Sequence, residues 1–240
     1  MQNRYQAWLE SSRWTFALER CQDLLHCLLS GWPRRSRSVL VMGAGSGAFV
    51  ETLWESGFDV TAQDNDPDFL ALARQRLGSR ADFVLGAPDH LPFDDCAFDY
   101  AVAAGAMEFW SHPEAVLKEM GRLSCSGIIV IFPNAWSLFG LECRLRPKHP
   151  LCAVARPLLQ SPWQLARLLS AVFGKKRRTW ASVLPGPSIS WGRKGLRRYI
   201  NMPRPRLPLG AFAGVRVDFG PLYTGTPLIL RASEPAASIK

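Results

Sequence analysis

The sequence predicts an α/β fold: a three-layer sandwich around a mainly parallel, doubly wound sheet, with an N-terminal helical cap and a basic C-terminal insertion. Two observations support this prediction. Strand-like and helix-like segments alternate between residues 38 and 133 with short connections, a pattern typical of parallel strands joined by crossover helices. Several of the strand-like segments are apolar throughout, as expected for strands covered on both faces.

Each element of this alternation has a local signal. Apolar residues recur at helical spacing from residue 3 to 30, and Gly31-Trp32-Pro33 ends the run. Asp66 and Pro67 stand as N-cap and first residue of a later helix, the pair that helix starts prefer. Strands are expected at 38–43, 58–63, 82–85, 98–104 and 127–132, and helices at 3–30, 47–55, 67–77 and 112–123.

The alternation stops after Pro133. Ser161-Pro162 begins one further helix, 163–173, ended by Gly174. Residues 175–210 are basic and rich in proline and glycine, so we expect a lid or insertion with little regular structure. Segments 211–219 and 227–232 are predicted to form two late strands, possible partners in a hairpin.

The composition of the 240-residue chain, 48% hydrophobic and 20% charged, is that of a globular protein. No apolar run approaches the roughly 18 residues that span a bilayer, and the N-terminus lacks the apolar region of a secretory signal. The six cysteines form neither a CxxC pair nor a zinc-like cluster with histidine, so we expect reduced thiols and no metal. A cytoplasmic location follows as an expectation.

The chemistry-bearing motif is Gly43-Ala44-Gly45-Ser46-Gly47, at the end of the first predicted strand. Glycines there permit a tight turn and close approach of a ligand to the backbone. The third glycine comes one residue too early for the dinucleotide fingerprint GxGxxG, which disfavours a nicotinamide oxidoreductase, and no Gly-Lys-Ser/Thr follows. Asp64, at the end of the second strand, can accept both ribose hydroxyls of an adenosine-containing ligand. The alternative is a glycine turn followed by a capping acid.

These residues carry a family resemblance. Val39–Gly47 and Gly57–Leu70 resemble motif I and the acidic motif of class I S-adenosylmethionine-dependent methyltransferases, and 91–108 and 114–123 resemble the segments around their fourth strand. Tyr5-Gln-Ala-Trp8 is similar to the lead-in of the small-molecule (type 11) branch, which includes quinone-biosynthesis methyltransferases. The resemblance covers residues 3–134. It implies one methyltransferase domain over 1–240: a helical cap (1–37), a cofactor-binding half (38–134) and a substrate-side half with the basic lid (135–240).

The resemblance also implies a cofactor site for S-adenosylmethionine. The glycine loop would hold the methionine portion, Asp64 the ribose and Asn65 would lie beside the adenine, with Ala104 and Gly105 behind the cofactor. Ala87 stands where the family often has an acid that contacts the adenine amino group, and Asp89, two residues on, or the backbone would make that contact here. Phe109 follows Glu108 where the family has histidine, and Cys125-Ser126-Gly127 replaces Pro-Gly-Gly.

The expected reaction is an in-line transfer of the methyl group from a sulfonium to an acceptor, for which the protein supplies orientation and a dry pocket. Glu108, His112 and His149 are the candidates for a base by residue type. Glu108 has a second candidate role, orienting the amino group of the cofactor. The sequence does not choose among them, and a carboxylate or acidic hydroxyl as acceptor would need no base.

Charge divides the chain in two. Residues 1–133 carry a net charge of −6 and residues 134–240 a net charge of +15. The basic half fits an anionic membrane surface, RNA, an acidic small substrate or simply a solvated face. No Asn/Asp-Pro-Pro-Tyr/Phe segment follows the fourth strand and no Pro-Cys dipeptide occurs, which disfavours nucleic acid. We therefore expect a small-molecule or lipid-like acceptor and a cytoplasmic chain that can lie peripherally at the membrane; the alternatives are an RNA methyltransferase and an inactive partner protein.

Overall fold

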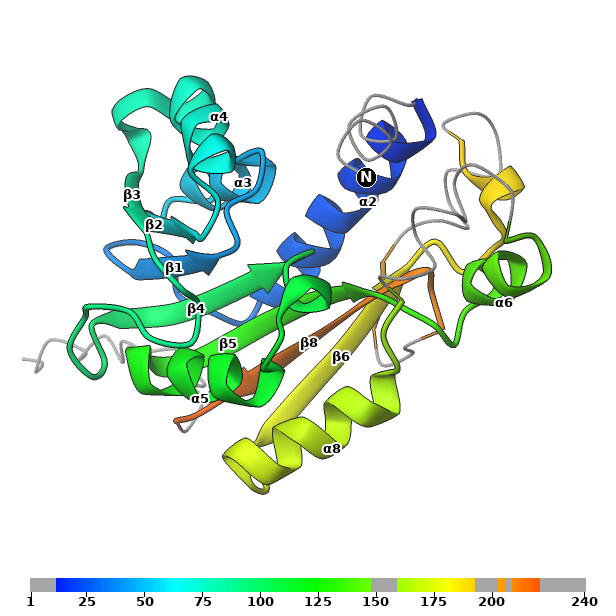
Figure 1. The fold of residues 1–240 in the computed structure, drawn as a ribbon. Coiled ribbons are helices and arrows are strands. Elements are labelled where there is room, and N and C mark those ends of the chain that lie inside the picture. Colours follow the sequence, from blue (N-terminus) through cyan, green and yellow to red (C-terminus); the bar gives the residue numbers. More distant parts are fainter. Residues whose placement is uncertain (1–11, 148–158, 193–202, 206–208, 221–240) are drawn as a thin grey trace, which may run out of the picture.

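A computed structural model describes residues 12–147, 159–192, 203–205 and 209–220, and these form a layered α/β structure around one sheet (Figure 1). The described strands pair in the order β3-β2-β1-β4-β5-β8-β6-β7. The predicted late strand 227–232 and the first residues of the predicted N-terminal helix lie outside the described residues.

The first five strands are parallel, and all five were predicted within a few residues of their bounds. The crossover after β3 returns the chain to the other side of β1, so β1 and β4 are neighbours although two strands separate them in sequence. The strands are β1 (Ser38–Met42), β2 (Asp59–Asp64), β3 (Asp82–Leu85), β4 (Phe98–Ala104) and β5 (Ser124–Pro133).

The second half of the chain extends this sheet with antiparallel strands. The late strand β8 (Phe212–Asp218) confirms the strand predicted at 211–219, and it pairs with β5 along its whole length. Its other neighbour is β6 (Arg177–Val183), which precedes it in sequence. Both edges of β8 are therefore paired, and the expected hairpin between 211–219 and 227–232 is wrong. The expectation of little regular structure over 175–210 is also wrong. The last three residues of β6, Ala181 to Val183, are buried, and the short β7 (Arg204–Pro205) pairs with the edge of β6 away from β8.

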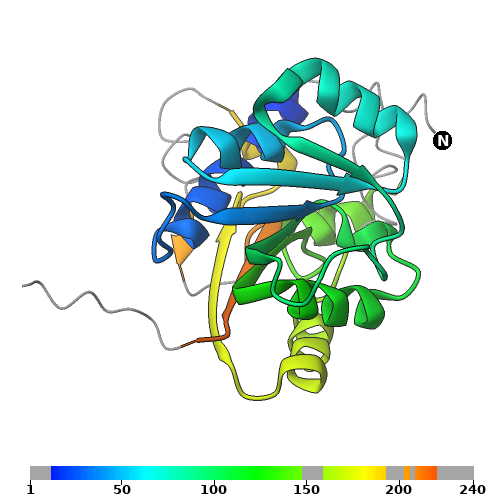
Figure 2. The ribbon, with the colours of Figure 1, turned by 90° about the vertical axis from the view of Figure 1, so that its left-hand side faces the viewer.

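Helices cover both faces of the sheet, as Figures 1 and 2 show. On one face, α2, α3 and α4 pack over alternate strand residues such as Val39 and Val41; on the other, α5 and α8 pack over Leu40 and Met42. Successive side chains of a strand point to opposite faces of the sheet, so this pattern is expected of a strand that is buried on both sides. The helices are α2 (Ser12–Leu29), α3 (Ala48–Glu55), α4 (Pro67–Leu77), α5 (Pro113–Leu123), α6 (Leu138–Leu145) and α8 (Pro162–Phe173), with short 3-10 turns η1 (Gly78–Arg80), η2 (Met107–Phe109) and η4 (Ser188–Ser190).

The cap predicted at Asp66 is confirmed: its carboxylate accepts a hydrogen bond from the Asp68 N–H at 2.9 Å, and Pro67 is the first helical residue of α4. Ser161 precedes α8 as predicted but makes no side-chain capping bond. Helix α6 was not predicted, and Ser137 caps it through the Gly140 N–H at 2.9 Å. None of the described helices is long and apolar enough to span a bilayer.

Candidate functional site

The candidate site lies at the carboxyl edge of the sheet, between β1 and β4. From β1 the chain adds β2 and β3 on one side, and it then crosses over to add β4 and β5 on the other side. Such a switch point leaves a crevice between the loops that leave the two strands. In this protein those loops touch: a side-chain carbon added at Gly43, where φ is +79°, would stand 2.3 Å from the Ala106 Cβ. Only glycine fits at position 43, because the lack of a side chain there allows the two loops to pack in direct contact.

The glycine loop is built for close approach to its backbone. Gly43 and Ala44 both donate to the Gln63 carbonyl at 2.9 Å, which fixes the turn against β2. Gly47 (φ +80°) packs on Leu77 of α4 and opens α3. Gly45 differs from these two: φ is +49°, and no atom of the part of the chain that the structure describes lies within 4 Å of the place a side chain would take. The loop therefore presents bare backbone to open space at Gly45.

Asp64 lies beside this open space, at the carboxyl end of β2. One carboxylate oxygen accepts the Gly45 N–H at 2.9 Å and the other accepts the Asp66 N–H at 3.1 Å. A carboxylate offers about four acceptor positions, so each oxygen keeps one for a ligand hydroxyl. Asp64 thus ties the glycine loop to β2 and can bind a ligand there; Asn65 follows it with an exposed side chain.

The loop after β3 forms the next wall, and Ala87 and Asp89 are both exposed on it. Buried Gln63 was not singled out in the sequence, yet it anchors this loop by donating from Nε2 to the Gly86 carbonyl at 2.6 Å. An amide at a strand position in an apolar run is the signal that marks it.

A second anchor of the same loop was also missed. Arg122 of α5 donates to the Leu91 and Phe93 carbonyls at 3.2 and 2.8 Å. It also pairs with Glu119, which accepts the Leu91 N–H at 2.8 Å. The guanidinium holds the pKa of the Glu119 carboxyl below its usual range. This ion pair fixes the far end of the loop that carries Ala87 and Asp89, and the i, i+3 spacing of the two residues is its only signal in the sequence.

The loop after β4 closes the site on the side of α2. It begins with buried Ala104 and with Gly105, where φ is +70°. Glu108 follows in η2, and its Oε2 is buried without a hydrogen-bond partner among the described residues. Burial raises the pKa of Glu108 to about 8. Cys21 of α2 is close enough for the Glu108 charge to add to the rise that burial causes in the pKa of its thiol.

The three candidate bases are not brought together. Glu108 is part of the site's wall, whereas His112 is the exposed N-cap residue of α5 and makes no side-chain capping bond. His149 lies outside the described residues. Among the residues that the structure describes, no group of three or more His, Cys, Asp or Glu side chains is arranged to hold a metal ion.

The basic half does not form one lid. Lys175 and Lys176 directly precede β6, whose first residue Arg177 stands in register with Asp218 of β8, and Asp218 with Gly127 near the start of β5. This cluster therefore lies at the amino edge of the sheet, opposite the glycine loop. Of the two expected roles of the basic insertion, a lid or a membrane-facing surface, the lid is wrong for Lys175 and Lys176, because they lie at the edge of the sheet away from the site. The basic residues at 193–198 lie outside the described residues.

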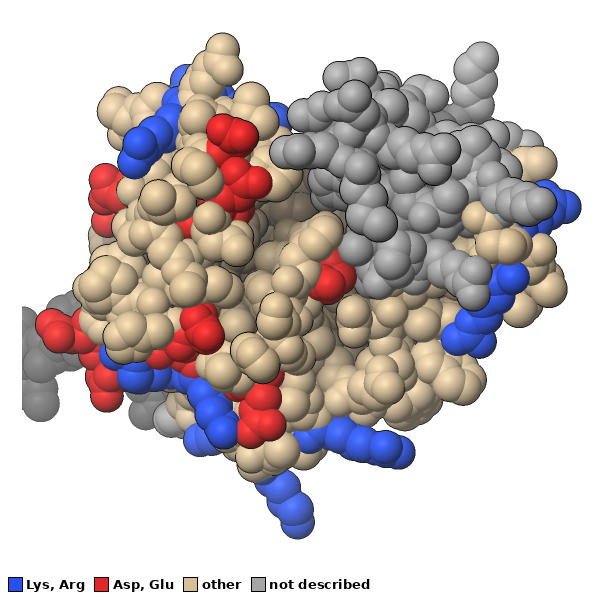
Figure 3. Space-filling model, in the orientation of Figure 1, with Lys and Arg blue, Asp and Glu red and all other residues tan. Residues whose placement is uncertain are grey.

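The space-filling view agrees with a ligand site in this region. Figure 3 shows the surface hollowed beside the part of the molecule formed by α3 and α4, with acidic side chains along the hollow. Bare backbone at Gly45, a carboxylate with free acceptor positions at Asp64 and the unpartnered Glu108 oxygen fit a nucleoside that carries positive charge.

Comparison with known proteins places these features in a family. Residues 40–132 match the family model described as a methyltransferase domain. The chain is 34% identical over 91 residues to an uncharacterized methyltransferase of Mycobacterium tuberculosis, a match covering 38% of this chain and 37% of that protein. It is 27% identical over 214 residues to the rice chloroplastic 2-methyl-6-phytyl-1,4-hydroquinone methyltransferase 2, covering 85% and 56%. The matches thus span less than two thirds of these relatives' lengths.

Solved structures share the fold. A methyltransferase of Thermotoga maritima superposes with a TM-score of 0.71 at 23% identity, over 90% of this chain and 95% of the other. The magnesium protoporphyrin IX methyltransferase of Synechocystis, solved with bound S-adenosylhomocysteine (SAH), has a TM-score of 0.63 at 12% identity, over 91% and 94%. The methyltransferase domain at residues 40–132 and the shared fold confirm the resemblance that the sequence led us to expect, to the class I S-adenosylmethionine-dependent methyltransferases.

Proposed function

We propose that this chain transfers a methyl group from S-adenosylmethionine to a small-molecule or lipid-like acceptor. The observation that carries the proposal is the open space over the Gly45 backbone, directly beside the Asp64 carboxylate at the switch point of the sheet. The rice relative is named for a hydroquinone that bears a phytyl chain, which supports an apolar acceptor for this protein.

Named residues have separate tasks in the proposed site. The Gly45 backbone would lie against the methionine portion, Asp64 would accept the ribose hydroxyls, and the loop with Ala87 and Asp89 would border the adenine. Gly105 would lie behind the cofactor. When bound, S-adenosylmethionine supplies a methyl group on a sulfonium, which needs no activation by the protein. The remaining work of the chain is orientation and exclusion of water.

The activity itself is tested by formation of SAH with a panel of apolar hydroquinones, phenols and carboxylates. We expect turnover with at least one apolar member. Cofactor binding without turnover across the panel would favour a non-catalytic partner protein instead.

Asp64→Ala is expected to weaken binding of S-adenosylmethionine about 10- to 100-fold, because hydrogen bonds to a charged group contribute about 1.5–3 kcal/mol. Calorimetric titration measures the change. The matched control is Asp66→Ala, two residues away, which removes the α4 cap and should cost about 1 kcal/mol of stability with unchanged affinity. Equal affinities of the two variants would contradict the assignment of Asp64.

We propose that Glu108 orients the cationic amino group of the cofactor. Its Oε2 has no described partner, and its loop contacts the glycine loop through Ala106 and Gly43. Because burial raises the pKa of Glu108 to about 8, most of its carboxyl is protonated at pH 7. A cation placed beside it favours the ionised form, so binding must release a proton.

The wild-type chain should therefore release a substantial fraction of one proton when it binds S-adenosylmethionine at pH 7, and its affinity should rise as the pH increases from about 6 to 7, below the range in which an α-amino group loses its own proton. In Glu108→Gln both effects should disappear. Titrations in buffers of different ionisation enthalpy measure the released protons. Proton release that persists undiminished in Glu108→Gln would assign it to another group.

A further inference from the structure

The outer face of α6 is apolar and exposed. Leu138, Leu141 and Leu145 follow one another at spacings of three and four, which places them on one side of the helix, and they are 54%, 49% and 74% exposed. The other side packs into the protein through buried Phe139 and Cys143. A row of leucines in water is unusual for a surface helix whose inner side already fills the core.

The acidic and basic side chains of α6 differ in their surroundings. Its one acid, Glu142, is bound by Ser188, whose N–H and hydroxyl donate to the two carboxylate oxygens at 2.7 and 2.8 Å. Arg144 and Arg146 are exposed at the end of the helix. The leucine face is therefore flanked by cations, while the acid is held against another segment of the protein.

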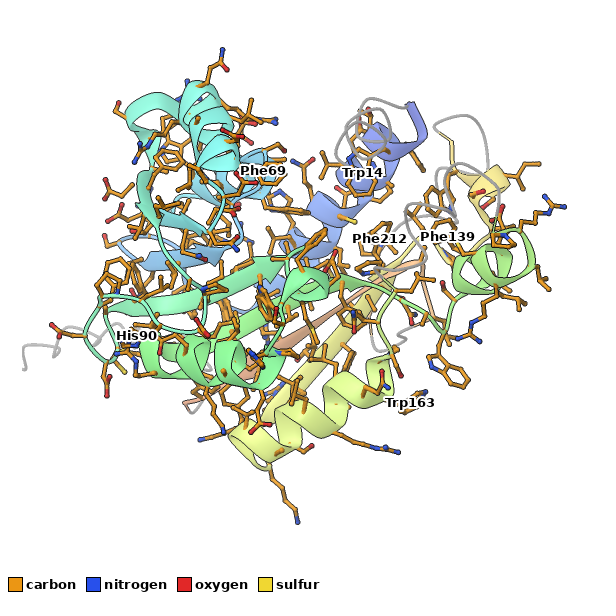
Figure 4. The ribbon with its side chains drawn as sticks, viewed as in Figure 1. Trp14, Phe69, His90, Phe139, Trp163 and Phe212 are labelled. Atoms are coloured by element: carbon orange, nitrogen blue, oxygen red, sulfur yellow. The ribbon has the colours of Figure 1, made fainter. Side chains whose placement is uncertain are left out.

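Two exposed tryptophans extend the apolar face. Trp136 precedes α6 and Trp163 lies in the first turn of α8, 58% and 62% exposed. The segments before the two helices are joined: Ala135 donates to the Gln160 carbonyl at 2.8 Å, beside the bridge between Asn134 and Gln160. Figure 4 shows Trp163 at the end of α8 that is nearer to α6.

We propose that the face formed by Trp136, Leu138, Leu141, Leu145 and Trp163, the α6 face, docks on an anionic lipid bilayer. Leucines and tryptophans on an amphipathic helix enter the boundary between headgroups and acyl chains, where tryptophan is enriched. Arg144 and Arg146 then meet the lipid phosphates. The charge of this face is complementary as well, since Arg144 and Arg146 are exposed beside it and the one acid of α6 is engaged by Ser188.

Docking at the α6 face would orient the candidate site. α6 follows the carboxyl end of β5, and the glycine loop follows the carboxyl end of β1, the same edge of the parallel sheet. The bilayer would thus lie toward the edge on which the site opens, where a lipid-like acceptor can reach it. The inference goes beyond the proposed reaction and does not depend on it.

Vesicle flotation at low salt tests the inference, without cofactor, on vesicles of phosphatidylcholine alone and mixed with phosphatidylglycerol. The wild-type chain should float with the anionic vesicles. The triple variant Leu138→Ser, Leu141→Ser, Leu145→Ser should lose at least about tenfold in partitioning, since each serine removes apolar surface that would enter the bilayer. Leu72→Ser is the matched control, an exposed leucine on α4, and should bind as wild type does.

Substitutions of the basic residues test which of the two basic regions binds the vesicles. Arg144→Gln and Arg146→Gln should each weaken binding about fivefold, whereas Lys175→Gln with Lys176→Gln, at the opposite edge of the sheet, should change it little. Loss of binding only in the lysine variant would overturn the inference, as would triple-variant binding equal to wild type. Sedimentation that shows a wild-type dimer converted to monomer by the triple variant would also overturn it, assigning the face to a second copy. An unchanged S-adenosylmethionine titration of the triple variant keeps this result separate from the proposed function.

Discussion

Replacing Gly45 with alanine is expected to weaken binding of S-adenosylmethionine by about a hundredfold or more, equivalent to about 3 kcal/mol. Within the described residues, no atom stands within 4 Å of the place the new methyl group would take. The methyl would instead occupy the space in which we place the ligand against the backbone. It would also strain the turn, because φ at Gly45 is +49°, a conformation that costs a residue with a side chain about 1–2 kcal/mol.

Gly78→Ala is the control that separates these two effects. Gly78 has φ of +59° and equally open surroundings, but it follows α4 at the amino edge of the sheet. Both variants should lose stability, measured by chemical denaturation, and only Gly45→Ala should lose affinity in a calorimetric titration. Wild-type affinity in a folded Gly45→Ala would place the cofactor elsewhere.

Asp218→Ala is expected to have the largest effect on stability, a loss of about 3–5 kcal/mol. Asp218 is buried at the end of β8, where its Oδ1 lies 3.2 Å from the Arg216 Nε and accepts the Trp32 indole N–H at 2.8 Å. Arg216 also donates to the Leu28 carbonyl at 2.9 Å, at the end of α2. Removing the carboxylate leaves a buried guanidinium without its counterion and frees the segment that joins α2 to β1.

Urea denaturation measures this loss. The control is Glu51→Ala, which breaks an exposed pair with Arg76 and should cost at most about 1 kcal/mol. A double variant with Arg216→Met and Asp218→Ala should be more stable than Asp218→Ala alone, because no buried charge is left unpaired. A loss for Asp218→Ala no larger than that for Glu51→Ala would show that the cluster contributes little to stability.

Local sequence signals were sufficient for the first half of the molecule. Three of the strands from 38 to 133, β1, β4 and β5, contain short apolar runs, and Asp66-Pro67 begins α4 as its capping preference requires. The glycine loop could also be located, because its glycines take positive φ angles that other residues rarely adopt. These features depend on neighbours close in sequence, which is why one chain read alone predicts them.

The second half depended on pairing between distant segments. β6 is a strand because β8 lies beside it, from Arg177 opposite Asp218 to Val183 opposite Phe212, and this pairing carries the lysines before β6 to the edge away from the site. The same long-range packing buries one oxygen of Glu108 and leaves the leucines of α6 exposed. The sequence by itself thus determined where the site residues lie along the chain: a glycine turn after the first strand and an acid at the end of the second. Only the tertiary structure decided which charged residues lie at the candidate site. The reason is that the burial of a side chain, and the edge of the sheet at which it lies, depend on residues that are distant in sequence but near in space.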